Sequence, residues 1–151
     1  MAAERTLVLL KPDAVQRGLT GKVIDRLESA GLKIAGMKLL QVNDDLASRH
    51  YAEHEDKPFY KGLVNFITSG PVVAMCLEGP GAIALTRKLM GSTNPADAAP
   101  GTIRGDFALD IGRNIIHGSA DEGDARREVS LFFSEGELMD YARDTDPWIV
   151  E

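Results

Sequence analysis

The chain has one cysteine, few aromatic residues and no long apolar run. Cys76 stands inside the apolar segment VVAMCL, so it can form no internal disulfide, and we expect it to pack as a small buried hydrophobic residue. No window of eighteen apolar residues occurs, and the N-terminal MAAERTL passes from a charged pair into a strand pattern without the apolar core of a signal peptide. These absences predict a cytoplasmic protein that does not span a membrane.

Positive charge is also in short supply. Lysine and arginine number 17 against 23 acidic residues, which gives a net charge of −6, and the acidic residues crowd together after residue 120. This balance argues against binding to a nucleic-acid backbone, and the strand patterns lack the interleaved aromatic residues of RNA-reading sheets. We therefore expect no specific nucleic-acid partner, and any anionic ligand must be held by a local cluster of cations.

The 151 residues, 44% apolar and 26% charged, have the size and balance of one compact domain over 1–151. Apolar runs predict strands at 6–10, 33–42 and 72–77, and the pair Ile115-Ile116 predicts a further one. Helices are expected from Thr20, taken as N-cap, to Gly31, over the polar stretch 44–55 capped by Asn43 or Asp44, over 59–70, after 79 and after 121. A further short helix is expected over SEGELMDY at 134–141. Because strands and helices do not alternate strictly, this order favours an α+β sandwich over a doubly wound parallel sheet.

The stretch between Gly91 and Gly112 is rich in Gly, Pro, Asn, Asp and Ala and shows neither helical nor strand periodicity. So long an irregular loop is uncommon in a compact domain unless it binds something or is disordered. Thr93 and Arg104 lie in it. The stretch is therefore a candidate binding loop.

His117 is the central candidate for chemistry. It follows the apolar pair Ile115-Ile116, and Gly118 removes the side chain that would crowd a ligand approaching the ring. A neutral imidazole is a competent nucleophile near neutral pH, provided that a partner on the far nitrogen orients it. Glu128, on the next predicted helix, can be that partner.

Several other residues suit a nucleoside triphosphate. Phosphoryl transfer requires in-line positioning and cations around the phosphates, commonly with Mg²⁺ bridging two of them. No GxxxxGK[ST] loop occurs, so side chains must replace the P-loop. The candidates are the cations Lys11, Arg87 and Arg104, the hydrogen-bonding residues Thr93 and Asn114, and Phe59. Phe59 begins an aromatic helical stripe beside Pro58, so we expect it to be the member of the stripe that is free for a planar ligand.

One alternative comes from residues 50–54, HYAEH, which match the inverted zinc-peptidase signature H-x-x-E-H. On one continuous helix, His50 and His54 would share a face and bind zinc. A five-residue match of this kind arises by chance, and no third ligand is evident. A zinc hydrolase is therefore the less favoured hypothesis.

The motifs NIIHGS around His117, GTIRGDF at 101–107, Lys11-Pro12-Asp13, HYAEHEDKPFY at 50–60 and TNPADAAPGTIRGD resemble those of nucleoside diphosphate kinases. The resemblance extends from Arg5 to Glu151. It implies a ferredoxin-like fold with a four-stranded antiparallel sheet and helices packed on it. It also implies homo-oligomers, of which we favour the hexamer over the tetramer, and ping-pong transfer of the terminal phosphate of a nucleoside triphosphate to a nucleoside diphosphate through a phosphohistidine.

Carried over by position, the resemblance makes His117 the nucleophile through Nδ1, with Glu128 and Ser119 holding the other ring nitrogen. Tyr51 would line the pocket beside the histidine. The phosphates would contact Lys11, Arg87, Thr93 and Arg104, the sugar would contact Lys11 and Asn114, and the base would lie between Phe59 and Ile111.

One position departs from the family pattern. Where that pattern reads His-Gly-Ser-Asp, this chain has Ala120, so an aspartate near the metal has been lost. Asp121, Glu122 and Asp124 are the candidates to replace it. Because Mg²⁺ is bound chiefly through phosphates and water, we expect the metal to be retained and no residue to be a dedicated ligand.

Overall fold

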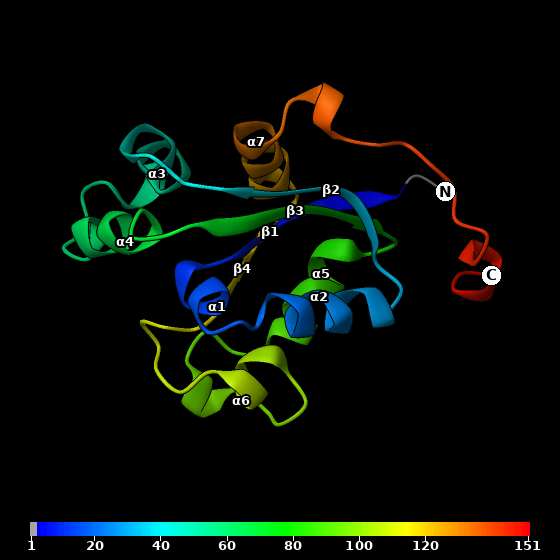
Figure 1. Ribbon diagram of the computed structural model, residues 1–151, viewed down its shortest axis with the longest axis horizontal. Helices are drawn as coiled ribbons and strands as arrows, with labels where there is room; N and C mark the ends of the chain where they lie inside the picture. Colours follow the sequence, from blue (N-terminus) through cyan, green and yellow to red (C-terminus); the bar gives the residue numbers. More distant parts are fainter. Residues whose placement is uncertain (1–2) are drawn as a thin grey trace.

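The computed structural model describes residues 3–151, and its centre is a four-stranded sheet. The strands are β1 (Glu4–Leu10), β2 (Lys33–Leu40), β3 (Val72–Gly79) and β4 (Ile116–Gly118), in the spatial order β2-β3-β1-β4 (Figure 1). Every neighbouring pair is antiparallel. The predicted α+β fold with a four-stranded antiparallel sheet is therefore confirmed.

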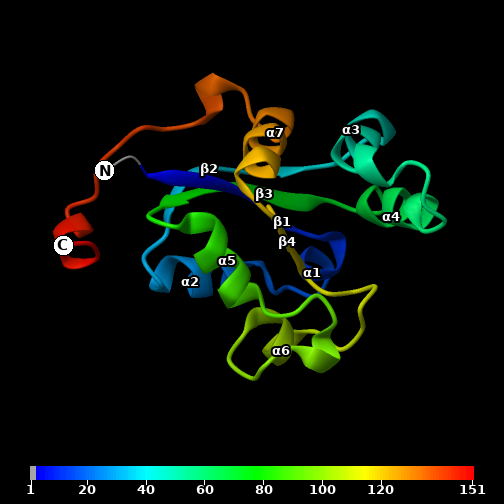
Figure 2. The same cartoon turned by 180° about the vertical axis from the view of Figure 1, so that it is seen from behind.

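In the described part of the chain, seven α-helices connect and cover these strands. They are α1 (Pro12–Gln16), α2 (Thr20–Ser29), α3 (Asp44–His50), α4 (Tyr60–Ile67), α5 (Ala82–Met90), α6 (Ile103–Phe107) and α7 (Glu122–Phe132). Figures 1 and 2 show α2, α5 and α6 on one side of the sheet and α7 and α3 on the other.

Because helices cover both faces, β1 is apolar at successive positions instead of alternating. Val8 and Leu10 join one buried cluster, which includes side chains of α2 and α5. Leu7 and Leu9 join a second buried cluster, with residues of α3, α4 and α7. The strand next to the candidate nucleophile is therefore fixed from two sides.

Two details of the predicted helices are wrong. Thr20 is the first residue of α2 and not its cap, because Leu19 is the N-cap and no side chain caps this helix. The predicted helix 44–55 ends at His50, and a separate 3-10 turn covers Ala52–His54. The cap expected at Asn43 is present, since its Oδ1 accepts a hydrogen bond from the Leu46 amide at 2.8 Å.

The stretch 91–112, expected to be irregular, holds a short helix. Thr102 caps α6 by accepting a hydrogen bond from the Gly105 amide at 3.0 Å, and a 3-10 turn occupies Pro95–Asp97. A five-residue helix is too short to give a periodic signal in the sequence. Arg104 therefore projects from a helix and not from a loop.

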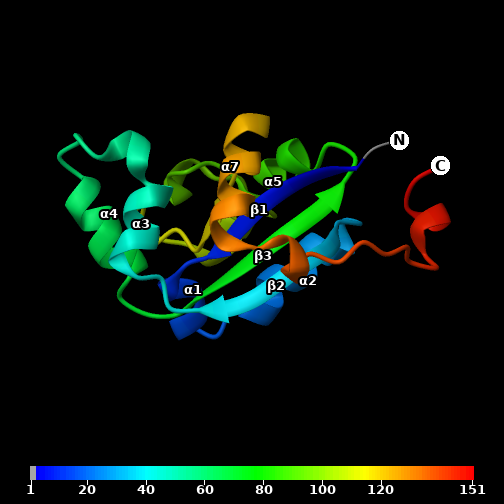
Figure 3. The same ribbon diagram turned by 90° about the horizontal axis from the view of Figure 1, so that it is seen from above.

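The segment after α7 runs along the outer side of β2 (Figure 3). A helix was expected over SEGELMDY, but only a 3-10 turn at Glu135–Glu137 forms. The Met139 amide then donates to the Ala35 carbonyl at 2.8 Å, and the Tyr141 hydroxyl donates to the Ile34 carbonyl at 2.5 Å. Within residues 3–151, no helix is both long and apolar enough to cross a membrane.

Candidate active site

His117 lies in the middle of β4, where it pairs with Leu9 of β1. The residue that leads into the strand, Ile115, has a φ of +77°. A β-branched residue is strained in that conformation, so neighbouring groups must hold it there. The Asp13 carboxylate accepts from the Ile115 amide at 2.9 Å, and the Lys11 amide donates to the Ile115 carbonyl at 2.9 Å. The start of α1 thus fixes the backbone that presents His117.

Glu128 of α7 holds one nitrogen of the His117 ring. Its Oε1 lies 3.0 Å from His117 Nε2 and accepts a hydrogen bond from Ser119 Oγ at 2.7 Å. Ser119 Oγ also accepts from the Leu7 amide at 3.2 Å, which ties the group to β1. The imidazole is therefore oriented by a carboxylate that is itself held by a hydroxyl group.

The charge of Glu128 is set by two opposing effects. Burial raises the pKa of this carboxyl, but the hydrogen bonds from His117 and Ser119 and the proximity of the imidazole outweigh that effect. The pKa of Glu128 therefore lies below its usual value, and the carboxylate is ionised at neutral pH. The negative charge of Glu128 beside Nε2 of His117 favours a proton on that nitrogen and leaves the Nδ1 lone pair free to react.

A cavity of about 660 Å³ opens in front of the ring. It is lined by nearly all the residues singled out from the sequence: Lys11, Tyr51, Phe59, Arg87, Thr93, Arg104, Ile111, Asn114, His117 and Glu128. Ser119 is the exception, because it is fully buried and contacts the site through Glu128. Segments as far apart in sequence as residues 11 and 128 therefore meet at one cavity.

Lys11 directly follows the last residue of β1. Its ammonium group donates to Asn114 Oδ1, and the Asn114 amide donates to the Thr93 carbonyl at 2.9 Å. Burial lowers the pKa of Lys11 to about 8; Asp13 opposes the shift, whereas Arg104 and Arg113 add to it. The lysine is thus charged at neutral pH but close to its titration range.

Arg104 is buried and already has several acceptors. Its Nε donates to the Asn114 carbonyl at 3.1 Å, and its two terminal nitrogens donate to the carbonyls of Gly91 at 3.1 Å and Ile116 at 2.5 Å. The guanidinium therefore ties α6 to the end of α5 and to β4 while one side lines the cavity. Burial and the charge of Arg87 lower the pKa of Arg104 to about 10.

The outer part of the cavity is apolar and open. Phe59 is 52% exposed and Ile111 is 56% exposed, and both line the cavity. Deeper in the cavity, Tyr51 packs edge-on against His50, with ring centroids 4.7 Å apart. Burial and the nearby carboxylate of Glu128 raise the pKa of Tyr51 to about 12, so its phenol stays protonated.

Gly118 has a packing role in addition to the expected one. A Cβ at this position would lie 2.6 Å from Met90 Sδ and 3.3 Å from Thr86 Cγ2, both in α5. The glycine therefore allows α5 to pack closely against β4. Gly118 also lines the cavity in front of His117, and the expectation that it keeps a ligand's approach to the ring clear stays a prediction.

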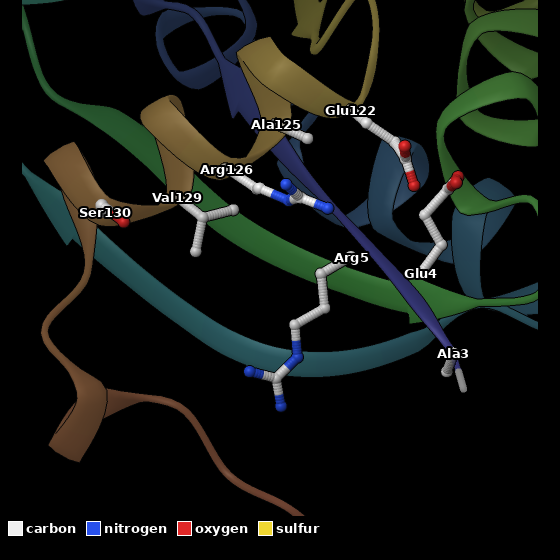
Figure 4. Close-up of a pocket in the computed structure, with 8 residues that line it drawn as sticks. All are labelled: Ala3, Glu4, Arg5, Glu122, Ala125, Arg126, Val129 and Ser130. Atoms are coloured by element: carbon white, nitrogen blue, oxygen red, sulfur yellow. The ribbon is translucent and has the colours of Figure 1, made fainter.

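A second hollow lies between the start of β1 and α7 (Figure 4). Figure 4 shows the carboxylates of Glu4 and Glu122 pointing toward one another, with Arg126 opposite. Arg5 pairs with Glu78 at 3.7 Å. Mixed charges of this kind do not suit a triphosphate, and His117 is not among the lining residues.

The zinc-peptidase interpretation of residues 50–54 is wrong in its premise. His50 is the last residue of α3 and is buried, whereas His54 lies in the following 3-10 turn with its Nε2 3.8 Å from Glu53. The two histidines therefore do not share a helical face. Sequence reasoning missed the burial of His50, because the polar stretch around it is typical of a surface helix.

The carboxylates around the cavity suit a divalent cation bound to phosphates. Of the three candidates to replace the aspartate absent at Ala120, Asp124 lines the cavity, while Asp121 caps α7 by accepting from the Asp124 amide at 2.8 Å. Burial and the carboxylates of Asp121, Glu128 and Glu53 raise the pKa of Asp124. This excess of negative charge is what a Mg²⁺ ion would relieve.

His50, His117 and Glu128 form the other set of possible metal donors, with ligand atoms within 4.8 Å of one another. Two nitrogens and one oxygen do not suit Mg²⁺, which prefers oxygen. His117 and Glu128 also already bind each other. The oxygen-lined side of the cavity therefore fits Mg²⁺ better.

Comparisons of the sequence and of the structure with known proteins all match the same family. The family model described as nucleoside diphosphate kinase matches residues 4–138. A nucleoside diphosphate kinase from Archaeoglobus fulgidus is 57% identical over 98% of each chain, and one from Thermus thermophilus is 61% identical over 90% of this chain and 99% of the relative. The structure of a halophilic nucleoside diphosphate kinase from Halobacterium salinarum in complex with CDP superposes with a TM-score of 0.96 at 57% identity, covering 98% of this chain and 99% of that one.

Proposed function

The chain is an enzyme of the nucleoside diphosphate kinase family, and from this premise we propose that it transfers the terminal phosphate of a nucleoside triphosphate to a nucleoside diphosphate through a phosphohistidine at His117. The observation that carries the proposal is the contact of 3.0 Å between His117 Nε2 and the Glu128 carboxylate, at the wall of a cavity that cations line. Because Nε2 is engaged, Nδ1 is the nitrogen left to react.

In the first half-reaction, the Nδ1 lone pair attacks the γ-phosphorus. The Nδ1–P bond forms as the bond from that phosphorus to the β,γ-bridging oxygen breaks, and the nucleoside diphosphate leaves with the electron pair. The proton on Nε2 stays there, and the anionic Glu128 offsets the positive charge that the ring acquires. In the second half-reaction, a terminal oxygen of another nucleoside diphosphate attacks the phosphorus. The Nδ1–P bond breaks as the new O–P bond forms, and its electron pair returns to Nδ1, which restores the neutral imidazole.

The cations bind and align the phosphates in this scheme. Lys11 comes from the turn between β1 and α1, Arg87 from α5 and Arg104 from α6. Thr93 adds a hydroxyl group. Such positioning and charge compensation are most of what phosphoryl transfer requires of a protein. Mg²⁺, bound mainly through the phosphates and near Asp124 and Glu53, would supply further charge neutralisation.

Residues in the outer part of the cavity would bind the base and the sugar. Phe59 and Ile111 would sandwich the base, and Lys11 and Asn114 would bind the sugar hydroxyls. Stacking contacts the face of a base and not its edges, so we expect little discrimination among bases. The complex of the Halobacterium salinarum relative with CDP supports a nucleoside diphosphate as ligand.

We also propose that one domain over 1–151 assembles into a homo-oligomer, with the hexamer favoured over the tetramer. The cytoplasmic location stays a prediction from the sequence. Support for self-association comes from apolar side chains exposed beside the edge strand β2, among them Met37 at 52% and Met139 at 54%.

The test of the function is to trap the intermediate. The protein, incubated with ATP labelled in the γ-phosphate, should form a phosphoenzyme that is acid-labile, alkali-stable and discharged by a nucleoside diphosphate. His117→Gln should abolish it and lower turnover by at least about a thousandfold, because no other group replaces the nucleophile. Label that persists in His117→Gln would show that the nucleophile is another residue.

A further inference from the structure

His50 is a buried histidine with an unpaired nitrogen. The residue is 3% exposed, and its Nδ1 has no hydrogen-bond partner among the described residues. Burying a polar atom without a hydrogen-bond partner lowers the stability of the fold by about 1–3 kcal/mol. An apolar side chain of the same shape has no such desolvation penalty. The sequence thus keeps a polar ring at a place where packing alone favours a leucine or a phenylalanine.

The ring is packed tightly against the active site. Its centroid is 4.9 Å from that of His117 and 5.4 Å from that of Phe132, both in edge-on geometry. His50 does not itself line the nucleotide cavity. It is therefore placed to act on the residues behind the nucleophile and not on the nucleotide.

The unpaired nitrogen faces the free oxygen of Glu128. Oε1 of that carboxylate is occupied by His117 and Ser119, whereas Oε2 lies 3.8 Å from His50 Nδ1 and 3.8 Å from Arg127 Nη2. The separation of 3.8 Å exceeds an ordinary N–H···O bond by about 0.8 Å, which a small rotation of the carboxylate closes.

We propose that His50 is a positioning residue: its neutral Nδ1–H donates to Oε2 of Glu128 and so aims Oε1 at Nε2 of His117 during phosphoryl transfer. This inference rests on the proposed function of His117. In this role His50 holds Oε2 of the carboxylate, whereas Ser119 holds Oε1.

A neutral donor suits this position better than a cation. Burial lowers the pKa of His50 to about 3; the charges of His117, Arg127 and His54 also lower it, and Glu128 opposes the shift. The ring therefore stays uncharged at neutral pH. A cation in its place would neutralise Glu128 and weaken its hold on the proton of His117, whereas an uncharged N–H orients the carboxylate and leaves its charge intact.

The test uses two variants of matched shape. In His50→Asn, the side-chain amide can place an N–H where Nδ1 lies, whereas His50→Leu has the same branching and no donor. Both variants lose the ring, so any loss of aromatic packing is common to the two. The measurement is single-turnover formation of the phosphoenzyme with labelled ATP, together with kcat, KM and thermal unfolding.

We expect His50→Leu to slow phosphorylation of His117 roughly 10- to 100-fold, and His50→Asn to recover most of that loss. KM for ATP should change less than about twofold in both, because His50 lies outside the cavity lining. His50→Leu should unfold at a temperature no lower than that of the wild type, since it removes an unpaired polar atom.

Three outcomes would overturn the inference. These are equal loss of rate in the two variants, a His50→Leu rate equal to that of the wild type, and a rise in KM that accounts for the whole effect. Phosphoenzyme formation by the wild type tests the proposed function separately from the role of His50. A wild type that forms no phosphoenzyme would contradict the proposed function, whereas a labelled wild type with indistinguishable variants contradicts only the role of His50.

Discussion

Lys11 shows how one buried charge can limit the pH range of the site. The pKa of its ammonium group is lowered to about 8, chiefly by burial. Below that pH the group is charged and able to bind phosphate, and above it the charge is lost. The opposing carboxylate of Asp13 is already used to hold the Ile115 amide, so it offsets the shift only in part.

We therefore expect kcat/KM to fall as pH rises through about 8, approaching a tenfold loss per pH unit. The measurement is the pH profile of kcat/KM for ATP from pH 7 to 9.5, because this ratio reports the groups of the free enzyme. Tyr51 does not titrate in this window, since its pKa is raised to about 12.

Lys11→Met is the matched control for this profile. Its kcat/KM should be low at every pH and should lack the fall near pH 8. A wild-type profile that stays flat to pH 9.5 would show that the lysine keeps its proton, and that burial shifts it less than the structure implies.

At the residue scale, the sequence singled out residues that the structure brings to one cavity, but it gave no indication of His50. The candidates from Lys11 to Glu128 were found because polar residues at strand ends, and the motifs around His117, carry a strong signal. His50 gave no such signal. It sits in the polar stretch HYAEHE, and its burial depends on how α3 docks beside α7, which periodicity cannot reveal.

At the scale of elements, α6 connects several of the segments that line the cavity. Its Arg104 donates to the carbonyls of Gly91, Asn114 and Ile116, so the helix connects the end of α5 with β4. Gly105 allows this placement. A Cβ there would lie 2.0 Å from the backbone carbonyl oxygen of Ala99, a contact that no rotamer change can relieve.

We expect Gly105→Ala to destabilise the protein by about 2–3 kcal/mol, because α6 must move away from Ala99 and carry Arg104 with it. Urea unfolding measures the stability, and kcat/KM should fall in parallel. Gly62→Ala is the control, since a Cβ at this exposed position in α4 meets nothing within 4 Å. That variant should gain about 0.5–1 kcal/mol from higher helix propensity. Equal stabilities for the two variants would argue against the close approach of α6 to residue 99.

The sequence predicted the long elements and not the short ones for a physical reason. The apolar run of β1 and the stripe of α4 extend over enough residues to show a pattern. In α6, five residues are stabilised by the cap of Thr102 and by the contacts of Arg104, which are tertiary interactions. The shift of β4 to Ile116–Gly118 has a similar origin, because Ile115 is held at positive φ by Asp13 and Lys11.

At the scale of the whole molecule, helices cover both faces of the sheet but β2 stays at its edge. The tail after α7 bonds to the β2 backbone at Ile34 and Ala35, and its Glu137 pairs with Lys38 of β2 at 3.1 Å. Met37 and Leu39 on the same strand are nevertheless 52% and 65% exposed. Exposed apolar side chains next to a strand edge favour pairing with another chain.

We therefore expect Met37→Asp to break the proposed homo-oligomer into smaller species, because the new carboxylate would lose its hydration in a contact across β2. Light scattering after size exclusion should give the wild type a mass several times the 16.3 kDa of one chain, and the variant a smaller one.

Ser130→Asp is the matched control, since it adds the same charge at an exposed position of α7 and should leave the mass unchanged. A wild type of 16.3 kDa would refute self-association, whereas an unchanged mass in Met37→Asp would move the interface away from β2. A dispersed variant that still forms the phosphoenzyme would separate assembly from chemistry.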